Sequence, residues 1–141
     1  MSLEHRFLEY AEAFEQSLID NDWLRLAQYF TENAVYDSGD GDPAQGREAV
    51  LAKFESAVDG LDRLMDKRVL DFTPPLTEDD TVNIEWTARY SKAGVPDLEV
   101  GGMEFARFEG QRIAHLRDEF KPGAMNSFVE WMAVHGEKLA G

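Results

Sequence analysis

Residues 20–51, DNDWLRLAQYFTENAVYDSGDGDPAQGREAVL, hold the densest set of structural signals in the chain. A helix covering about residues 4–20 ends where this stretch begins, and the apolar positions from Trp23 to Phe30 predict a second, short helix. Residues 34–37 predict a short strand, which an acidic, Gly-rich loop follows. Gly46 then precedes a third helix. The stretch therefore predicts two helices, a strand and another helix in close succession.

Apolar stripes support these helices. Phe7, Ala11, Phe14 and Leu18 recur at helical spacing in the first one. Asp22 stands where its side-chain oxygen can accept from the free N–H groups of the second helix, so we expect it to act as the N-cap.

The period of the pattern changes to two after Asp66. A strand begins near residues 69–72, and Pro74 and Pro75 must end it or place it at an edge. Residues 81–91 alternate cleanly between apolar and polar side chains, and residues 98–108 and 111–120 predict a hairpin. The chain, residues 1–141, is thus expected to form one α+β domain with a mostly antiparallel sheet and a last helix from about residue 122.

Composition excludes several classes of function. The chain has 28 acidic and 14 basic residues, and its net charge of −14 repels nucleic acid and anionic lipid. No apolar run reaches membrane-spanning length, and the absence of cysteine excludes disulfides and thiolate sites. The three histidines form no chelating pair, so no metal or other cofactor is expected. The expected location is the cytoplasm.

The last hairpin brings two carboxyl groups together. A tight turn would set Phe108 near Arg112 and Glu104 near Leu116. Glu104 and Asp118 would then share the inner face, one diagonal step apart and roughly 5–8 Å from each other. Burial and mutual repulsion would split their pKa values, leaving one proton donor and one base.

These features resemble the nuclear transport factor 2-like superfamily, in its SnoaL-like and ketosteroid-isomerase-like branch. The resemblance rests on residues 20–23, 34–37, 46–50 and 106–113, and it spans roughly residues 5–121. It implies a curved, mostly antiparallel sheet wrapped around helices, a cystatin-like α+β barrel whose concave face lines a conical pocket.

The resemblance also assigns positions in that pocket. Glu104 falls where ketosteroid isomerases place a protonated Asp that stabilises an oxyanion. Ser38 and Phe14 stand where those enzymes have an Asp and a Tyr, so the chain departs from them there. Asp118 matches an active-site Asp of the limonene epoxide hydrolases.

The sequence therefore predicts a cofactor-independent enzyme for a small hydrophobic molecule, with Asp118 as base and Glu104 as donor. Isomerisation, cyclisation, dehydration and epoxide opening all fit. The expected substrate contacts are Phe14, Tyr36, Ser38, Trp86, Tyr90 and Phe120.

Interpretations without catalysis also stay open. The fold also suits a non-catalytic module that binds a hydrophobic ligand or dimerises. Asp118 could pair with Arg89, and the pocket aromatics could be plain core. A bulge at Gly101 and Gly102 would turn Glu104 outward.

The opposite face of the hairpin is also partly apolar. By strict alternation it carries Met103, Phe105, Ile113 and His115. A sheet face that meets water should be polar, so this face predicts a homodimer interface.

Overall fold

The computed structural model of the chain describes residues 2–39 and 41–139. Asp40, in the acidic loop, lies outside the described residues. The helices are α1 (Leu3–Asp20), α2 (Arg47–Gly60) and α3 (Ala124–His135), with 3₁₀ segments η1 (Trp23–Tyr29), η2 (Asp62–Leu64) and η3 (Gly136–Leu139). The strands are β1 (Phe30–Asp37), β2 (Ala44–Gln45), β3 (Lys67–Phe72), β4 (Leu76–Glu78), β5 (Thr81–Lys92), β6 (Val95–Glu109) and β7 (Arg112–Phe120).

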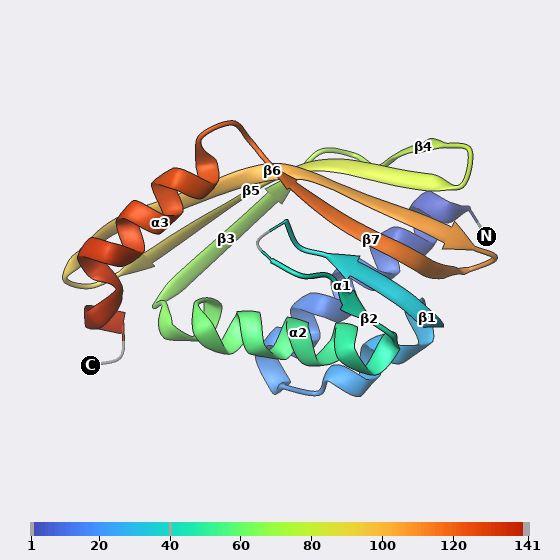
Figure 1. Ribbon diagram of the computed structural model, residues 1–141, viewed down its shortest axis with the longest axis horizontal. Helices are drawn as coiled ribbons and strands as arrows, with labels where there is room; N and C mark the ends of the chain where they lie inside the picture. The colour runs from blue at the N-terminus through green and yellow to red at the C-terminus, as the bar shows by residue number, and fades with distance from the viewer. Residues whose placement is uncertain (1, 40, 140–141) are drawn as a thin grey trace.

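The strands form one curved sheet in the order β2-β1-β7-β6-β5-β3. β1 runs parallel to β7, whereas the pairs β7–β6, β6–β5 and β5–β3 are antiparallel. The sheet does not close on itself: it arches over α1, α2 and η1, which cover its concave face (Figure 1). The predicted α+β fold with a mostly antiparallel sheet is confirmed, in an open form.

One edge of the sheet is interrupted. β3 and β4 both pair with β5, and Pro74 and Pro75 stand between them. Proline has no N–H to donate to a ladder, so the strand stops and resumes after the pair. Two short strands, β3 and β4, thus pair with this side of β5 in place of one long strand.

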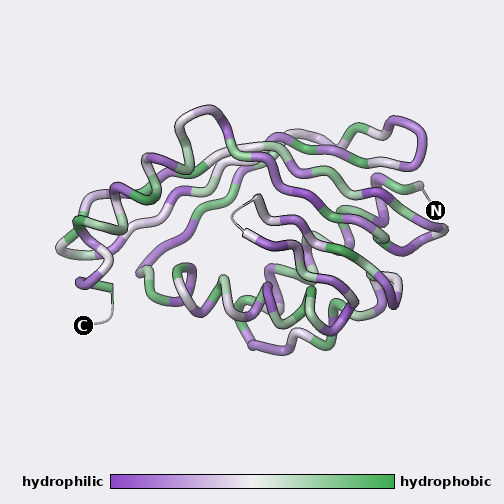
Figure 2. Tube along the Cα trace, in the orientation of Figure 1, coloured by the Kyte–Doolittle hydropathy of each residue, from purple (hydrophilic) through white to green (hydrophobic). Residues whose placement is uncertain are grey.

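The core lies between the concave face and the helices. Phe7, Leu26, Phe30 and Leu116 have almost no exposed surface. Each large apolar side chain buried in this way contributes about 1.5–3 kcal/mol to folding. Hydrophobic and hydrophilic residues are interspersed along the strands (Figure 2). In β5 the buried residues Val82, Ile84, Ala88 and Tyr90 lie an even number of residues apart, so they share one face.

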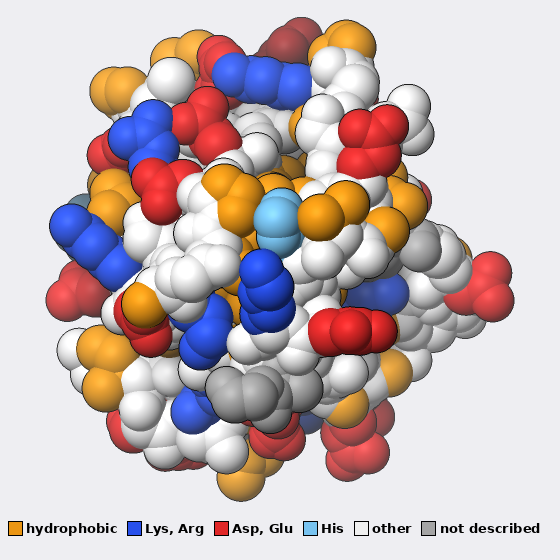
Figure 3. Space-filling view, turned by 90° about the vertical axis from the view of Figure 1, so that its left-hand side faces the viewer, with side chains coloured by type: hydrophobic (Ala, Val, Ile, Leu, Met, Phe, Trp, Pro, Cys, Tyr) orange, Lys and Arg blue, Asp and Glu red, His pale blue; other side chains and the backbone are white. Residues whose placement is uncertain are grey.

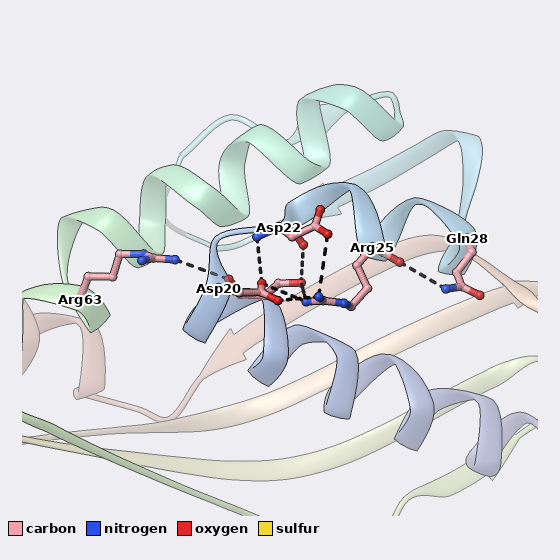
Figure 4. A network of polar contacts seen from close by, with 6 residues as sticks. Asp20, Asp22, Arg25, Gln28 and Arg63 are labelled. Atoms are coloured by element: carbon pink, nitrogen blue, oxygen red, sulfur yellow. Dashed lines mark hydrogen bonds and ion pairs between the residues drawn. The ribbon is translucent and has the colours of Figure 1, made fainter.

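A polar network joins α1 to η1. Arg25 holds the Asp20 carboxylate, with Nη2 2.5 Å from Oδ2, and this bond lowers the pKa of Asp20 to about 2 (Figure 4). The predicted cap by Asp22 is wrong, because its side chain makes no capping hydrogen bond. Its carboxylate instead lies 3.8 Å from Arg25.

α3 packs at the end of the sheet where β5 and β6 turn. Phe128 and Trp131 contact the buried cluster that contains Tyr90 and Leu98, and Trp131 Nε1 donates to the Pro96 carbonyl at 3.2 Å. The face at this end carries acidic and basic side chains interspersed with apolar ones (Figure 3). α3 therefore covers apolar residues at the end of β5 and β6.

The register of the last hairpin differs from the predicted one. Phe108 pairs with Ile113 but Arg107 pairs with His115, so Ala114 is an extra residue that bulges from β7. Ile113 stands opposite the inward-facing Phe108, where Arg112 was expected, so its side chain lies in the core and is fully buried. The prediction that Ile113 lies on the outer face is therefore wrong.

Candidate functional site

A cavity of about 210 Å³ lies under the concave face of the sheet. Its walls come from α1, α2, η2, β1, β3, β5, β6 and β7, which the curved sheet brings around one space. Aromatic side chains supply much of its surface, among them Tyr10, Phe14, Tyr36, Phe54, Phe72, Trp86 and Tyr90.

Glu104 and Asp118 both line this cavity. The bulge at Ala114 shifts the register so that the two residues stand directly opposite each other on β6 and β7. The predicted diagonal offset is wrong because the register differs by two residues: Phe108 stands opposite Ile113 instead of Arg112, and the bulge at Ala114 adds one more. Directly opposed residues in an antiparallel pair have Cβ atoms about 4.5–5.5 Å apart, so the two carboxyl groups meet.

Asp118 is held from two sides. Tyr36 Oη donates to Asp118 Oδ2 at 2.6 Å. Tyr36 comes from β1, whose parallel pairing with β7 sets Tyr36 beside Leu116, two residues before Asp118. Glu104 makes a second side-chain hydrogen bond with Asp118. The three side chains therefore form one connected group across three adjacent strands.

Burial raises the pKa of Glu104 well above its usual value, and the charge of Asp118 and their hydrogen bond raise it further. The raised pKa favours the protonated form of Glu104, and the hydrogen bond links the two carboxyl groups. Burial also raises the pKa values of Tyr10 and Tyr36, with the carboxyl charges adding to the effect. Both phenols stay neutral.

The carboxyl pair is surrounded by protein but is accessible from the cavity. Glu104, Asp118 and Tyr36 keep part of their side-chain surface accessible, although neighbouring strands and helices surround them. All three residues line the cavity, and Asp118 also borders a second pocket beside Phe120 and Lys121. A ligand in the cavity would touch the carboxyl groups directly.

A second polar cluster lies along the cavity from the first. Arg68 on β3 pairs with Glu15 of α1 and, at 2.6 Å, with Asp62 of η2. Tyr90 Oη donates to Asp62 Oδ2 at 3.2 Å. Burial raises the pKa of Asp62, and the charge of Arg68 partly offsets that effect.

Sequence reasoning missed this cluster. Arg68 is in phase with Leu70 and Phe72, which also line the cavity, so strand alternation carried the signal. Glu15 directly follows Phe14, whose side chain belongs to the apolar stripe of α1.

The predicted contact residues divide into two groups. Phe14, Tyr36, Trp86 and Tyr90 line the cavity. Ser38 is buried outside the cavity wall. Phe120 also stands outside it and packs edge-on against Trp86, with 6.1 Å between ring centroids. The structure therefore brings four of these six side chains to the carboxyl pair's cavity and leaves two behind it.

The alternative positions of the pair do not occur. Arg89 is ion-paired with Glu99 at 2.6 Å instead of with Asp118. Gly101 and Gly102 pair in regular register with β5, so no bulge there turns Glu104 outward. Within residues 2–39 and 41–139, no group of three or more His, Asp or Glu side chains is placed to hold a metal ion. No helix in this part of the chain is long and apolar enough to span a bilayer.

Comparison with known proteins agrees with this architecture. The profile of the SnoaL-like domain family matches residues 7–116. The chain belongs to the SnoaL-like domain family. The comparison with curated proteins found no match.

Three solved structures show how widely the SnoaL-like fold of this chain recurs. Bal32a, from a soil-derived mobile gene cassette, has a TM-score of 0.69 at 19% identity, over 92% of this chain and 98% of that one. A protein with a ketosteroid isomerase-like fold from Catenulispora acidiphila, in complex with trimethylamine, has a TM-score of 0.60 at 19% identity, over 82% and 88%. An LEH-like epoxide hydrolase from M. tuberculosis has a TM-score of 0.62 at 13% identity, over 92% and 93%. At these identities the likeness shows the fold alone.

Proposed function

We propose that this SnoaL-like domain is a cofactor-independent enzyme that moves protons on a small hydrophobic molecule. Asp118 is the base and Glu104 the proton donor. The observation that carries the proposal is a pair of hydrogen-bonded carboxyl groups, directly opposite each other on β6 and β7, in the wall of an aromatic cavity of about 210 Å³. Such a pair supplies an acid and a base at one place near neutral pH.

Tyr36 fits this division of roles. Its hydroxyl donates to Asp118 and stabilises the ionised form of that carboxyl. The proton then stays on Glu104, whose pKa is raised by burial and further by the charge of Asp118. Isomerisation, cyclisation, dehydration and epoxide opening each need one group that gives a proton and one that takes it.

The size of the cavity limits the substrate. Ligand pockets commonly measure about 300–1,000 Å³, whereas this one measures about 210 Å³. Phe14, Phe54 and Trp86 line the space without filling it. A single ring with short substituents is the scale of molecule that fits.

A non-catalytic binding module is the second candidate. The bond between Tyr36 and Asp118 joins neighbouring strands, which is also what a purely structural pair would do. The same cavity would then hold a hydrophobic ligand without changing it. The epoxide hydrolase and the ketosteroid isomerase-like neighbour support the enzyme only at the level of the fold.

Turnover separates the two candidates. Wild type and Asp118→Asn would be assayed against small hydrophobic epoxides, ketones and alcohols by mass spectrometry. The proposal expects one class to be converted by wild type and not by Asp118→Asn. Glu119→Gln is the matched control, because it removes the same charge from the next, outward-facing residue of β7. Full activity of Asp118→Asn contradicts the assignment.

Thermal stability gives a second, substrate-free measurement. Active sites often sacrifice stability, and relieving the strain of a buried acidic pair commonly returns about 0.5–2 kcal/mol. We expect Glu104→Gln to melt higher than wild type at neutral pH, because Gln keeps a donor toward Asp118 and, unlike Glu104, takes up no proton on folding. If both Glu104→Gln and Asp118→Asn melt lower, the pair is structural and the binding module is favoured.

A further inference from the structure

The cavity reaches the surface of the molecule between α1 and β3. Ala11 and Glu15 stand one turn apart on α1, and both line the cavity and are half-buried. Glu12, between them in the chain, is exposed, so this side of α1 lies at the surface. Phe72 of β3 also lines the cavity and is 38% exposed. We call this boundary the α1–β3 seam; its cavity-lining residues are Ala11, Glu15, Arg68, Leu70 and Phe72.

Side chains alone close the seam. β3 ends the path of the sheet, so its outer edge pairs with no other described strand. Among the described residues, no backbone hydrogen bond joins α1 to β3. Arg68, Leu70 and Phe72 alternate along β3 and therefore point to the same side of it. The polar contact that spans the seam is the ion pair of Arg68 with Glu15.

The two partners of this ion pair are held unequally. Arg68 also pairs with Asp62 at 2.6 Å, and these two side chains are only 15% and 12% exposed. Asp62 is fixed in turn by the hydroxyl of Tyr90, which donates to it at 3.2 Å. The Glu15 side chain, in contrast, is 41% exposed. Arg68 is therefore the fixed half of the contact, and Glu15 is the half that moves.

Opening this contact leaves no buried charge without a partner. When Glu15 moves away, Asp62 still pairs with the Arg68 guanidinium, and water solvates the Glu15 carboxylate. Breaking an ion pair is costly mainly when one charge stays behind buried and unpaired, which does not happen here. Ion pairs whose members keep contact with solvent contribute little to stability. The contact therefore favours the closed seam only slightly, and the seam opens readily.

We propose that the α1–β3 seam is the entrance to the cavity and that Glu15, through its ion pair with Arg68, is the latch that closes it. The proposal holds for either candidate function, because a small hydrophobic molecule must enter the cavity to be bound as well as to be converted. The latch belongs to the path and not to the bound state. Its removal should speed entry and exit together and leave the affinity unchanged.

A single introduced thiol measures entry without any knowledge of the ligand. The chain has no cysteine, and Ala88 lines the cavity and is only 2% exposed. Ala88→Cys would be labelled with iodoacetamide from pH 7 to 10, and rates compared for the thiolate, which removes any change in the pKa of the thiol. Adding Glu15→Gln should speed labelling about three- to five-fold. An unchanged rate overturns the proposal.

Two controls separate the latch from general loosening. Glu12→Gln removes the same charge from an exposed position of α1 outside the cavity wall and should leave the rate unchanged. Ala34→Cys places the thiol in the core, at a fully buried residue that does not line the cavity. Glu15→Gln should not speed labelling there. Equal acceleration at both thiols would show that the whole core opens, which contradicts a latch.

Two alanines locate the entrance. Ala57 of α2 is exposed and also lines the cavity, so it marks the rival route. In the Ala88→Cys background, Ala11→Trp should slow labelling about ten-fold, because the bulky indole fills the seam. Ala57→Trp should leave the rate nearly unchanged. The reverse order would place the entrance at α2 and overturn the proposal. If Ala11→Trp does not fold, the result with Glu15→Gln decides.

Salt tests the same contact without a change at the seam. Screening weakens the attraction between partly exposed charges. Raising NaCl from 0.05 to 1 M should therefore speed labelling of Ala88→Cys and should not speed it further when Glu15→Gln is present. The same acceleration in both proteins would show that salt acts elsewhere, and this contradicts the assignment of Glu15 as the latch.

Discussion

The protonated state of Glu104 makes a prediction about stability and pH. Between the ordinary carboxyl pKa and the raised pKa of Glu104, the folded chain holds a proton that the unfolded chain has released. The free energy of unfolding therefore falls as pH rises through that window, by up to about 1.4 kcal/mol per pH unit. The free energy of unfolding of the Glu104→Gln variant should not show this decrease. Urea unfolding of both proteins from pH 5 to 8 measures it.

Glu119→Gln provides the comparison for that experiment. Glu119 is exposed and next to Asp118, and its carboxylate pairs with Arg117 at 2.7 Å. Its replacement should leave the pH dependence of wild type unchanged. If Glu104→Gln and wild type differ by the same amount at every pH, Glu104 is ionised in the folded chain and the assignment of the donor fails.

Tyr36→Phe isolates the other hydrogen bond of the site. It removes the hydroxyl that donates to Asp118 at 2.6 Å and keeps the ring that packs on Phe54. A hydrogen bond to a charged group is worth about 1.5–3 kcal/mol, so we expect that loss in the free energy of unfolding. Tyr29→Phe is the control, since Tyr29 is a buried phenol of the same core outside the cavity wall. Equal losses in both variants would show a general effect of removing a hydroxyl.

At the scale of single residues, the sequence placed the pair on the correct face but not in the correct register. Alternation along β6 and β7 puts Glu104 and Asp118 inward, and that periodicity is visible without a structure. The extra residue Ala114 is invisible in the pattern, because Ile113 and Ala114 are both apolar. Arg68 was missed because a charged residue on a strand is ordinarily assigned to the solvent face.

Gly102 determines how closely β6 and β7 approach beside the pair. A Cβ at this position would lie 2.3 Å from the Glu119 carbonyl oxygen, which is backbone and cannot rotate away. Gly102→Ala should therefore displace the two strands and cost about 1–3 kcal/mol or more. It should also weaken the Glu104–Asp118 contact two residues along. Denaturant unfolding measures the first effect, and the titration of Glu104 by NMR measures the second.

Gly60→Ala is the matched variant for this test. A Cβ at Gly60 meets nothing within 4 Å, and the residue ends α2. Alanine is the better helix former, so this change should be neutral or slightly stabilising. Similar losses from both glycines would mean that chain flexibility, and not the close approach at Gly102, sets the cost.

The sequence predicted best those helices and strands in which apolar residues recur at a regular spacing. α1, α2 and β5 follow the apolar spacing within one or two residues. β4 was not predicted, because its few residues lie between Pro75 and a turn and have no period of their own. The cap by Asp22 failed because η1 is a 3₁₀ segment and the side chain is drawn to Arg25.

At the scale of the whole molecule, the convex face of the sheet remains a predicted homodimer interface. With Ile113 in the core, the hairpin contributes Met103 and Phe105, which are half-buried, beside His115. The exposed Leu76 of β4 lies in the same row as Phe105, because both stand opposite Asn83. The Arg117 guanidinium lies 4.3 Å from the centre of the Phe105 ring and covers part of it. The hairpin therefore supplies a smaller apolar surface than strict alternation suggested.

Dimerisation must also overcome repulsion between two chains of net charge −14 each. Salt screens charges that lie more than about 8–10 Å apart in solution. We therefore expect the dimer to tighten as salt rises, opposite to an interface held by ion pairs. Sedimentation equilibrium from 0.05 to 0.5 M NaCl measures the dissociation constant. Phe105→Glu should give monomers at every salt concentration, whereas Leu24→Glu, exposed on η1 away from the convex face, should not. A wild type that stays monomeric at high salt, or a Phe105→Glu variant that still dimerises, contradicts an interface on this face.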